Sequence, residues 1–126
     1  MERVVSDREP SDRRIGAVLA ELEGVIASRK GGSPARSYTS RLLAGGVATI
    51  GGKVTEEAGE LVQAAAAESA ERVVAEAADL TYHLLVLLAA RDVPLVSIAD
   101  ELARRFGVSG LDEKAARPAK AGGGAA

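Results

Sequence analysis

The chain has 126 residues and a formal net charge of −2, so it fits one domain with a core of its own. Its interspersed charges exclude a basic stripe for nucleic acid, and the absence of cysteine excludes disulfides and thiolate zinc sites. Because no apolar run approaches the roughly 20 residues of a membrane span and the charged N-terminus lacks a signal-peptide core, we expect a cytoplasmic protein without membrane contact.

The N-terminal part of the chain predicts a flexible leader over residues 1–10 and a first helix. The helix is expected to begin at Ser11, because serine side chains cap helix N-termini. Apolar residues then recur with the 3.6-residue period of a helix. Gly31 and Gly32 are expected to end this helix, and Pro34 prevents its continuation.

A short helix over 37–44, ended by Gly45 and Gly46, is expected before a long helix over about 47–68. Gly51 and Gly52 should weaken the start of the long helix, because each glycine costs about 1 kcal/mol relative to alanine. The side chains expected on its buried side are Val47, Ile50, Val54, Ala58, Leu61, Val62 and Ala65.

Ser69 is expected to cap a third long helix, and Pro94 to stand at the start of a last one that Gly107 ends. The third helix carries a wide apolar stripe of Val73, Val74, Ala77, Leu80, Leu84, Leu87 and Leu88. No segment alternates with the period of two that a half-buried strand requires. We therefore predict an all-α bundle of four to five helices over residues 11–117, followed by a disordered tail over 118–126.

Two acidic clusters interrupt this apolar pattern, Glu56-Glu57-x-x-Glu60 and Glu76-x-x-Asp79. A helix advances about 100° per residue, so Glu60 falls between Glu56 and Glu57, and Glu76 and Asp79 lie about 60° apart. Each cluster is therefore one-sided. If the two helices pair antiparallel, up to five carboxylates converge on one small volume.

Converging carboxylates repel one another strongly unless cations neutralise them. Mg²⁺, or alternatively Mn²⁺, prefers such an all-oxygen environment, so the pattern favours a metal site that serves phosphate chemistry. The alternative is an ordinary solvated helix face. Two features favour the metal site over it: no Lys or Arg follows any of these glutamates at the i+4 spacing of a helical ion pair, and the second cluster lies in the most apolar helix.

The sequence allows more than one role for three further side chains. His83 follows Asp79 by one helical turn and either packs in the core or takes part in the site. Lys53 either attracts phosphate or forms an ion pair with Glu56 or Glu57. Arg41 offers a guanidinium suited to bidentate phosphate contacts.

Longer motifs add to the acidic pattern E-E-x-x-E followed by E-x-x-D. They are Ser-Tyr-Thr-x-x-Leu-Leu-Ala-Gly-Gly over 37–46, Ala-Ala-Asp-Leu-x-Tyr-His-Leu-Leu-Val-Leu-Leu over 77–88 and Gly-Val-Ser-Gly-Leu-x-Glu-Lys-Ala-x-Arg over 107–117. Together, over about residues 36–118, the chain resembles the phosphoribosyl-ATP pyrophosphohydrolase family, within the MazG-like superfamily of all-α NTP pyrophosphatases. Gly51 and Gly52 depart from the better helix formers usual there.

The resemblance implies hydrolysis of phosphoribosyl-ATP to phosphoribosyl-AMP and pyrophosphate, an early step of histidine biosynthesis. The implied ligands of one or more Mg²⁺ ions are Glu56, Glu57, Glu60, Glu76 and Asp79. Among them, Glu57 and Glu76 are the expected catalytic carboxylates. The expected contacts to substrate phosphates are Arg41, Lys53, Lys114 and Arg117.

Two alternatives belong to other classes. The acidic motif also permits a house-cleaning enzyme that hydrolyses free nucleoside triphosphates, although the Tyr82-His83 segment argues against it. A non-enzymatic helical interaction module would use the apolar stripes to bind a partner and leave the carboxylates as surface decoration. The thin, alanine-rich core and the resemblance both favour a homodimer.

Overall fold

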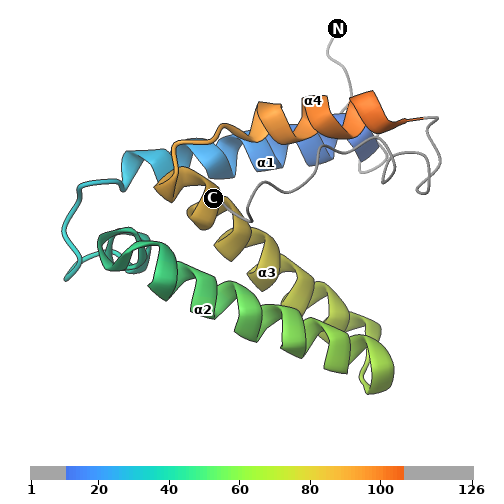
Figure 1. Ribbon diagram of the computed structural model, residues 1–126. Coiled ribbons are helices and arrows are strands. Elements are labelled where there is room, and N and C mark those ends of the chain that lie inside the picture. The colour runs from blue at the N-terminus through green and yellow to red at the C-terminus, as the bar shows by residue number, and fades with distance from the viewer. Residues whose placement is uncertain (1–10, 107–126) are drawn as a thin grey trace, which may run out of the picture. The chain divides into compact units, whose positions relative to one another are not determined.

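The computed structural model describes residues 11–106, which form four helices and no strand (Figure 1). The helices are α1 (Ser11–Ser28), α2 (Tyr38–Ala67), α3 (Ala70–Ala90) and α4 (Leu95–Arg105). The prediction of an all-α fold is therefore confirmed. The expected leader 1–10, the end of the last helix at Gly107 and the tail 118–126 lie outside the described residues. The chain divides into two units, 1–95 and 96–126.

The first unit is built on an antiparallel hairpin of α2 and α3, which pack along their length (Figure 1). Both helices begin at a serine whose side chain satisfies a free backbone N–H group. Ser37 Oγ accepts from the N–H of Ser40 at 3.1 Å, and Ser69 Oγ accepts from the N–H of Arg72 at 3.2 Å. The predicted cap at Ser69 is thus confirmed. Helix α1 contacts α3.

Helix α2 is kinked at Gly46, where the chain leaves helical geometry with φ 86° and ψ −177°. This backbone conformation is strained for any residue that carries a Cβ atom, so it is essentially restricted to glycine. The break that the sequence predicted at Gly45 and Gly46 is therefore present. Gly51 and Gly52, which we expected to weaken the helix, lie within the helical continuation of α2.

Five buried side chains from all three helices of the first unit form its hydrophobic core, and Ile50 and Val86 are fully shielded from solvent. The cluster consists of Ile26, Leu42, Ile50, Leu85 and Val86. Five residues that we placed in the apolar stripes are instead exposed, namely Val47, Val62, Ala65, Val74 and Leu84. That prediction was wrong, because the helices that pack against α2 and α3 cover a narrower stripe of each than the apolar residues of the sequence offer.

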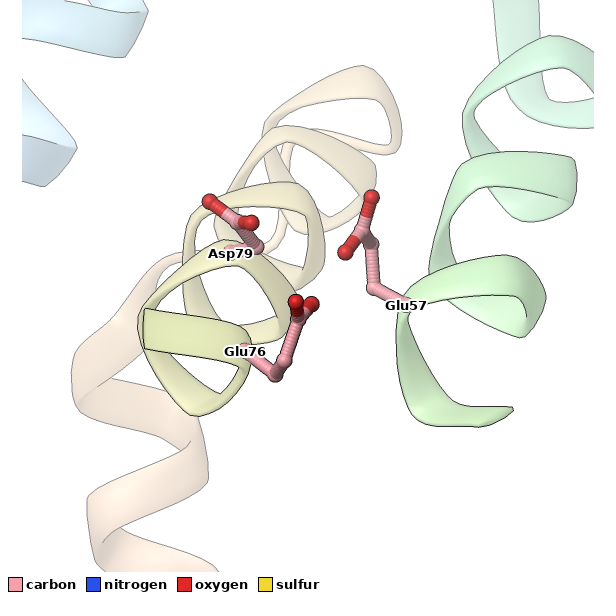
Figure 2. Close-up of side chains that lie close together, drawn as sticks. All are labelled: Glu57, Glu76 and Asp79. Carbon is pink, nitrogen blue, oxygen red and sulfur yellow. The ribbon is translucent and has the colours of Figure 1, made fainter. Parts of the chain in front are cut away.

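One described helix, α3, is long and apolar enough by length and composition to cross a membrane. From the sequence we expect no membrane span. The length and composition of α3 are a weak indication, since a core helix of a soluble protein passes the same test. Helix α3 also carries two carboxylates, Glu76 and Asp79, that face Glu57 of α2 (Figure 2).

Helix α4 begins directly after Pro94, as the sequence predicted. The N–H group of Leu95 donates to the Glu23 carboxylate of α1 at 2.7 Å, which satisfies one of the free donors at the start of α4. Near the end of α4, hydrogen bonds from Arg104 and Arg105 lower the pKa of Glu101 to about 2.

Two glycines of α2 allow a matched test of the kink. Gly46→Ala should lower the free energy of unfolding by about 1–3 kcal/mol, because alanine disfavours the φ of 86°. Gly52→Ala should raise it by up to about 1 kcal/mol, because that site is helical. A Cβ atom at either site meets open space, so backbone conformation alone separates the two variants. Chemical denaturation of both variants gives the sign of each change in the free energy of unfolding. Changes of the same sign would contradict the assignment of the kink.

Candidate metal centre

Three carboxylates meet across the α2–α3 hairpin, Glu57 from α2 and Glu76 and Asp79 from α3 (Figure 2). One oxygen from each lies within 4.8 Å of the other two. Glu57 and Glu76 are 6% and 5% exposed, whereas Asp79 is exposed to solvent. The cluster therefore has a buried floor and an open side through which a ligand can reach it.

The two buried carboxylates are incompletely satisfied. Glu57 Oε1 and Glu76 Oε1 are both buried and have no hydrogen-bond partner among residues 11–106. A buried carboxylate oxygen without a partner is strongly unfavourable, and a second one beside it adds repulsion. A divalent cation held by Glu57, Glu76 and Asp79 would relieve both penalties with the oxygen ligands that Mg²⁺ prefers. The donor set thus fits a hard divalent ion.

Each buried glutamate has a basic residue one turn before it on its own helix. Lys53 Nζ lies 3.8 Å from Glu57 Oε2 and 3.2 Å from Glu56 Oε1. Arg72 forms an ion pair with Glu76, and its Nε lies 3.3 Å from Glu68 Oε1. Hydrogen bonding to Glu68 and attraction by Glu76 raise the pKa of the Arg72 guanidinium. No role for Arg72 is predicted from the sequence, although it precedes Glu76 by the same four residues that separate Lys53 from Glu57.

The remaining predicted ligands lie at the edge of this centre. Glu56 is exposed and paired with Lys53, and it does not belong to the group of three. Glu60 is also exposed, but a hydrogen bond shared with Glu76 and repulsion by Glu57 raise its pKa above the ordinary 4.5. The structure therefore brings three of the five predicted carboxylates together and places Glu60 beside them.

An aromatic group adjoins the centre. His83 is buried, and its Nδ1 lies 2.8 Å from the backbone carbonyl oxygen of Asp79. Because a carbonyl only accepts, Nδ1 carries a hydrogen, and a neutral ring then accepts the Tyr38 hydroxyl at Nε2, 3.0 Å away. Tyr82 stacks on Tyr38 with ring centroids 6.3 Å apart and shares a hydrogen bond with Thr39. This network ties the start of α2 to the middle of α3.

The other predicted phosphate contacts are placed as follows. Arg41 is exposed, and its Nε donates to the carbonyl oxygen of Pro34 at 3.4 Å. Lys114 and Arg117 lie outside the described residues. Of the two that the structure describes, Lys53 is the one in contact with the carboxylates.

The fold and the site define an all-α helical protein with a largely buried carboxylate centre that could hold a metal ion. Comparison with known proteins is more specific. Residues 19–106 match the model of the family described as phosphoribosyl-ATP pyrophosphohydrolase. The chain belongs to the phosphoribosyl-ATP pyrophosphohydrolase family.

Curated relatives carry a corresponding name. The chain is 52% identical over 102 residues to a phosphoribosyl-ATP pyrophosphatase of Novosphingobium aromaticivorans, covering 81% of this chain and 95% of the relative. It is 55% identical over 100 residues to the protein of that name from Trichlorobacter lovleyi, covering 79% and 93%. The relative from Rhodospirillum rubrum is 53% identical over 100 residues, covering 79% and 86%.

The raised pKa of Glu60 predicts a pH effect in protein stripped of divalent ions. The folded state binds the Glu60 proton more tightly than the unfolded chain, so this contribution to stability is present below about pH 4.5 and is lost as the pH rises through the folded pKa. As the pH rises through that window, the thermal midpoint of the wild type should therefore fall by more than the thermal midpoint of Glu60→Gln.

Thermal melts in EDTA from pH 4 to 8, followed by circular dichroism, measure this difference. Glu71→Gln, at an exposed carboxylate in the first turn of α3, is the control and should follow the wild type. Parallel curves for the wild type and Glu60→Gln would show that the Glu76 carboxyl does not perturb Glu60.

Proposed function

We propose that the chain hydrolyses phosphoribosyl-ATP to phosphoribosyl-AMP and pyrophosphate, in histidine biosynthesis, and that it depends on a divalent cation, Mg²⁺ or alternatively Mn²⁺. Family membership supports the reaction. The observation that supports the metal is the pair of buried oxygens without a partner, Glu57 Oε1 and Glu76 Oε1. The whole domain over 11–117 is proposed to act as one catalytic unit, in the cytoplasm.

Glu57, Glu76 and Asp79 are the proposed inner ligands, with Glu60 and Glu56 beside them. The bound ion would neutralise phosphate charge and lower the pKa of a coordinated water. Glu57 and Glu76 are buried, so they are the proposed carboxylates that orient the attacking water and take up its proton.

Basic side chains are proposed to bind the negative phosphates of the substrate. Lys53 is well placed for this role, because its ammonium group lies beside the acidic centre. Arg41, Lys114 and Arg117 are proposed to contact more distant phosphates. His83 and Tyr38 fix the backbone of Asp79 against α2, and so they position that ligand rather than meet the phosphates.

A homodimer is the proposed assembly. Large apolar side chains remain exposed on the α2–α3 hairpin, including Val62 and Val74 at 68% each. A second copy of the hairpin would bury these side chains against matching apolar ones, as in a two-fold symmetric interface.

The metal role predicts the phenotype of an isosteric amide. Asp79→Asn should lower kcat/KM for phosphoribosyl-ATP by about 100-fold or more, because several kcal/mol of charge stabilisation depend on the ion. It should also reduce the rise in thermal midpoint that saturating Mg²⁺ gives the wild type, since ligand binding to the folded state stabilises it.

Pyrophosphate release and melting curves measure the two effects. Glu71→Gln, on the same helix but away from the centre, is the matched control and should keep both properties. Wild-type activity of Asp79→Asn at saturating Mg²⁺ would refute its role as a ligand. Faster hydrolysis of common nucleoside triphosphates than of phosphoribosyl-ATP would instead favour a house-cleaning enzyme.

The dimer proposal predicts the effect of a charge on the exposed apolar face. Val62→Glu should convert the dimer to a monomer, because it would bury a carboxylate in an apolar contact. Gln63→Glu adds the same charge at the next, already polar and exposed position and should leave the dimer intact. Sedimentation velocity separates the two states, and a monomeric wild type would refute the assembly.

A further inference from the structure

Arg72 forms an ion pair with the buried Glu76, and no role is predicted for it from the sequence. Its guanidinium bridges two carboxylates of α3 and its N-terminal junction, Glu68 through Nε and Glu76 through Nη2. The Arg72 side chain is 54% exposed, whereas the Glu76 side chain is 6% exposed. The guanidinium therefore lies at the solvent edge of the centre, with one end directed inward.

The contact with Glu76 satisfies only part of that carboxylate. Arg72 bonds Oε2, while Oε1 of Glu76 and Oε1 of Glu57 have no partner. A cation that entered between these oxygens would draw the negative charge of Glu76 toward itself and repel the guanidinium. The ion pair between Arg72 and Glu76 must therefore weaken when the centre is filled.

Glu68 keeps the guanidinium close to the centre during such an exchange. Its carboxylate accepts from Nε at 3.3 Å, a different nitrogen from the one that contacts Glu76. The five N–H donors of an arginine are arranged as a planar fork, so Nη2 can release one acceptor while Nε keeps another. A phosphate oxygen next to the carboxylates is the anion that would then meet the free donors.

Lys53 and Arg72 also bracket the centre. Lys53 precedes Glu57 by one turn on α2, and Arg72 precedes Glu76 by one turn on α3. Because α2 and α3 run antiparallel, the two cations lie toward opposite ends of the centre along the hairpin axis (Figure 1). A phosphate chain laid across the carboxylates would thus meet one cation at each end.

We propose that Arg72 is a further phosphate-binding residue of this site: it bonds Glu76 while no cation is bound and turns to the pyrophosphate portion of the ligand when a divalent cation occupies the carboxylates. This inference rests on the proposed function, since it needs the carboxylates to hold a cation. It assigns to Arg72 two measurable properties, competition with the cation and attraction of pyrophosphate.

The test uses Arg72→Met, which keeps the aliphatic length, and Arg72→Lys, which keeps the charge. Calorimetric titration of the full chain with Mn²⁺ should give Arg72→Met about twofold to fivefold tighter binding than the wild type, because the competing counterion is gone. Titration with inorganic pyrophosphate at saturating Mg²⁺ should give it about 10- to 100-fold weaker binding. Arg72→Lys should recover part of the pyrophosphate affinity.

Arg91→Met is the matched control, because Arg91 is an exposed arginine at the other end of α3. It should bind Mn²⁺ and pyrophosphate like the wild type. A merely structural Arg72 would leave pyrophosphate affinity unchanged in Arg72→Met, and that result overturns the proposal, as does unchanged affinity in Arg72→Lys if the methionine variant does not fold.

Failure of the proposed function would be distinct from failure of this inference. A wild type that binds Mn²⁺ and pyrophosphate but does not hydrolyse phosphoribosyl-ATP would contradict the reaction and leave the Arg72 measurements interpretable. A wild type that binds neither probe would overturn both proposals.

Discussion

Two glutamate side chains from different helices are buried face to face in this protein, and most of the local structure serves to hold them there. Glu57 and Glu76 approach each other across the α2–α3 hairpin although like charges in a poorly solvated place repel. The serine cap at Ser69 fixes where α3 begins, and hence the register of Glu76. Lys53 and Arg72 supply only part of the compensating charge. The negative charge that remains uncompensated is the physical reason to expect a cation.

Local chemistry made much of this predictable from sequence. Ser69 is a helix cap because a hydroxyl can accept from a free N–H group one turn on, and that requires no knowledge of the rest of the chain. Gly46 breaks a helix for a similarly local reason. The three-residue spacing from Glu76 to Asp79 places both carboxylates on one side of a helix, and the antiparallel pairing then brings them to Glu57.

Features that depend on the partner helix were harder to predict. Glu56 and Glu57 are adjacent, and the sequence predicts both as metal ligands. Only Glu57 faces α3, whereas Glu56 pairs with Lys53 in solvent. Val62 and Val74 have the spacing of core residues, yet the neighbouring helix does not reach them. The hydrogen bond of Tyr38 with His83 joins residues 45 apart. Arg72 was different, since its spacing of four residues before Glu76 was visible in the sequence.

The kink at Gly46 separates two tasks within a single helix. Beyond it, inserting or deleting one residue before Glu57 would turn the carboxylate by about 100° and remove it from its partners on α3. On the N-terminal side, the short turn that carries Tyr38 follows a different axis. A change in loop length before that turn therefore does not rotate Glu57 about the axis of α2. The connection between α1 and α2 can therefore differ in length among related proteins while Glu57 keeps its position opposite Glu76 and Asp79.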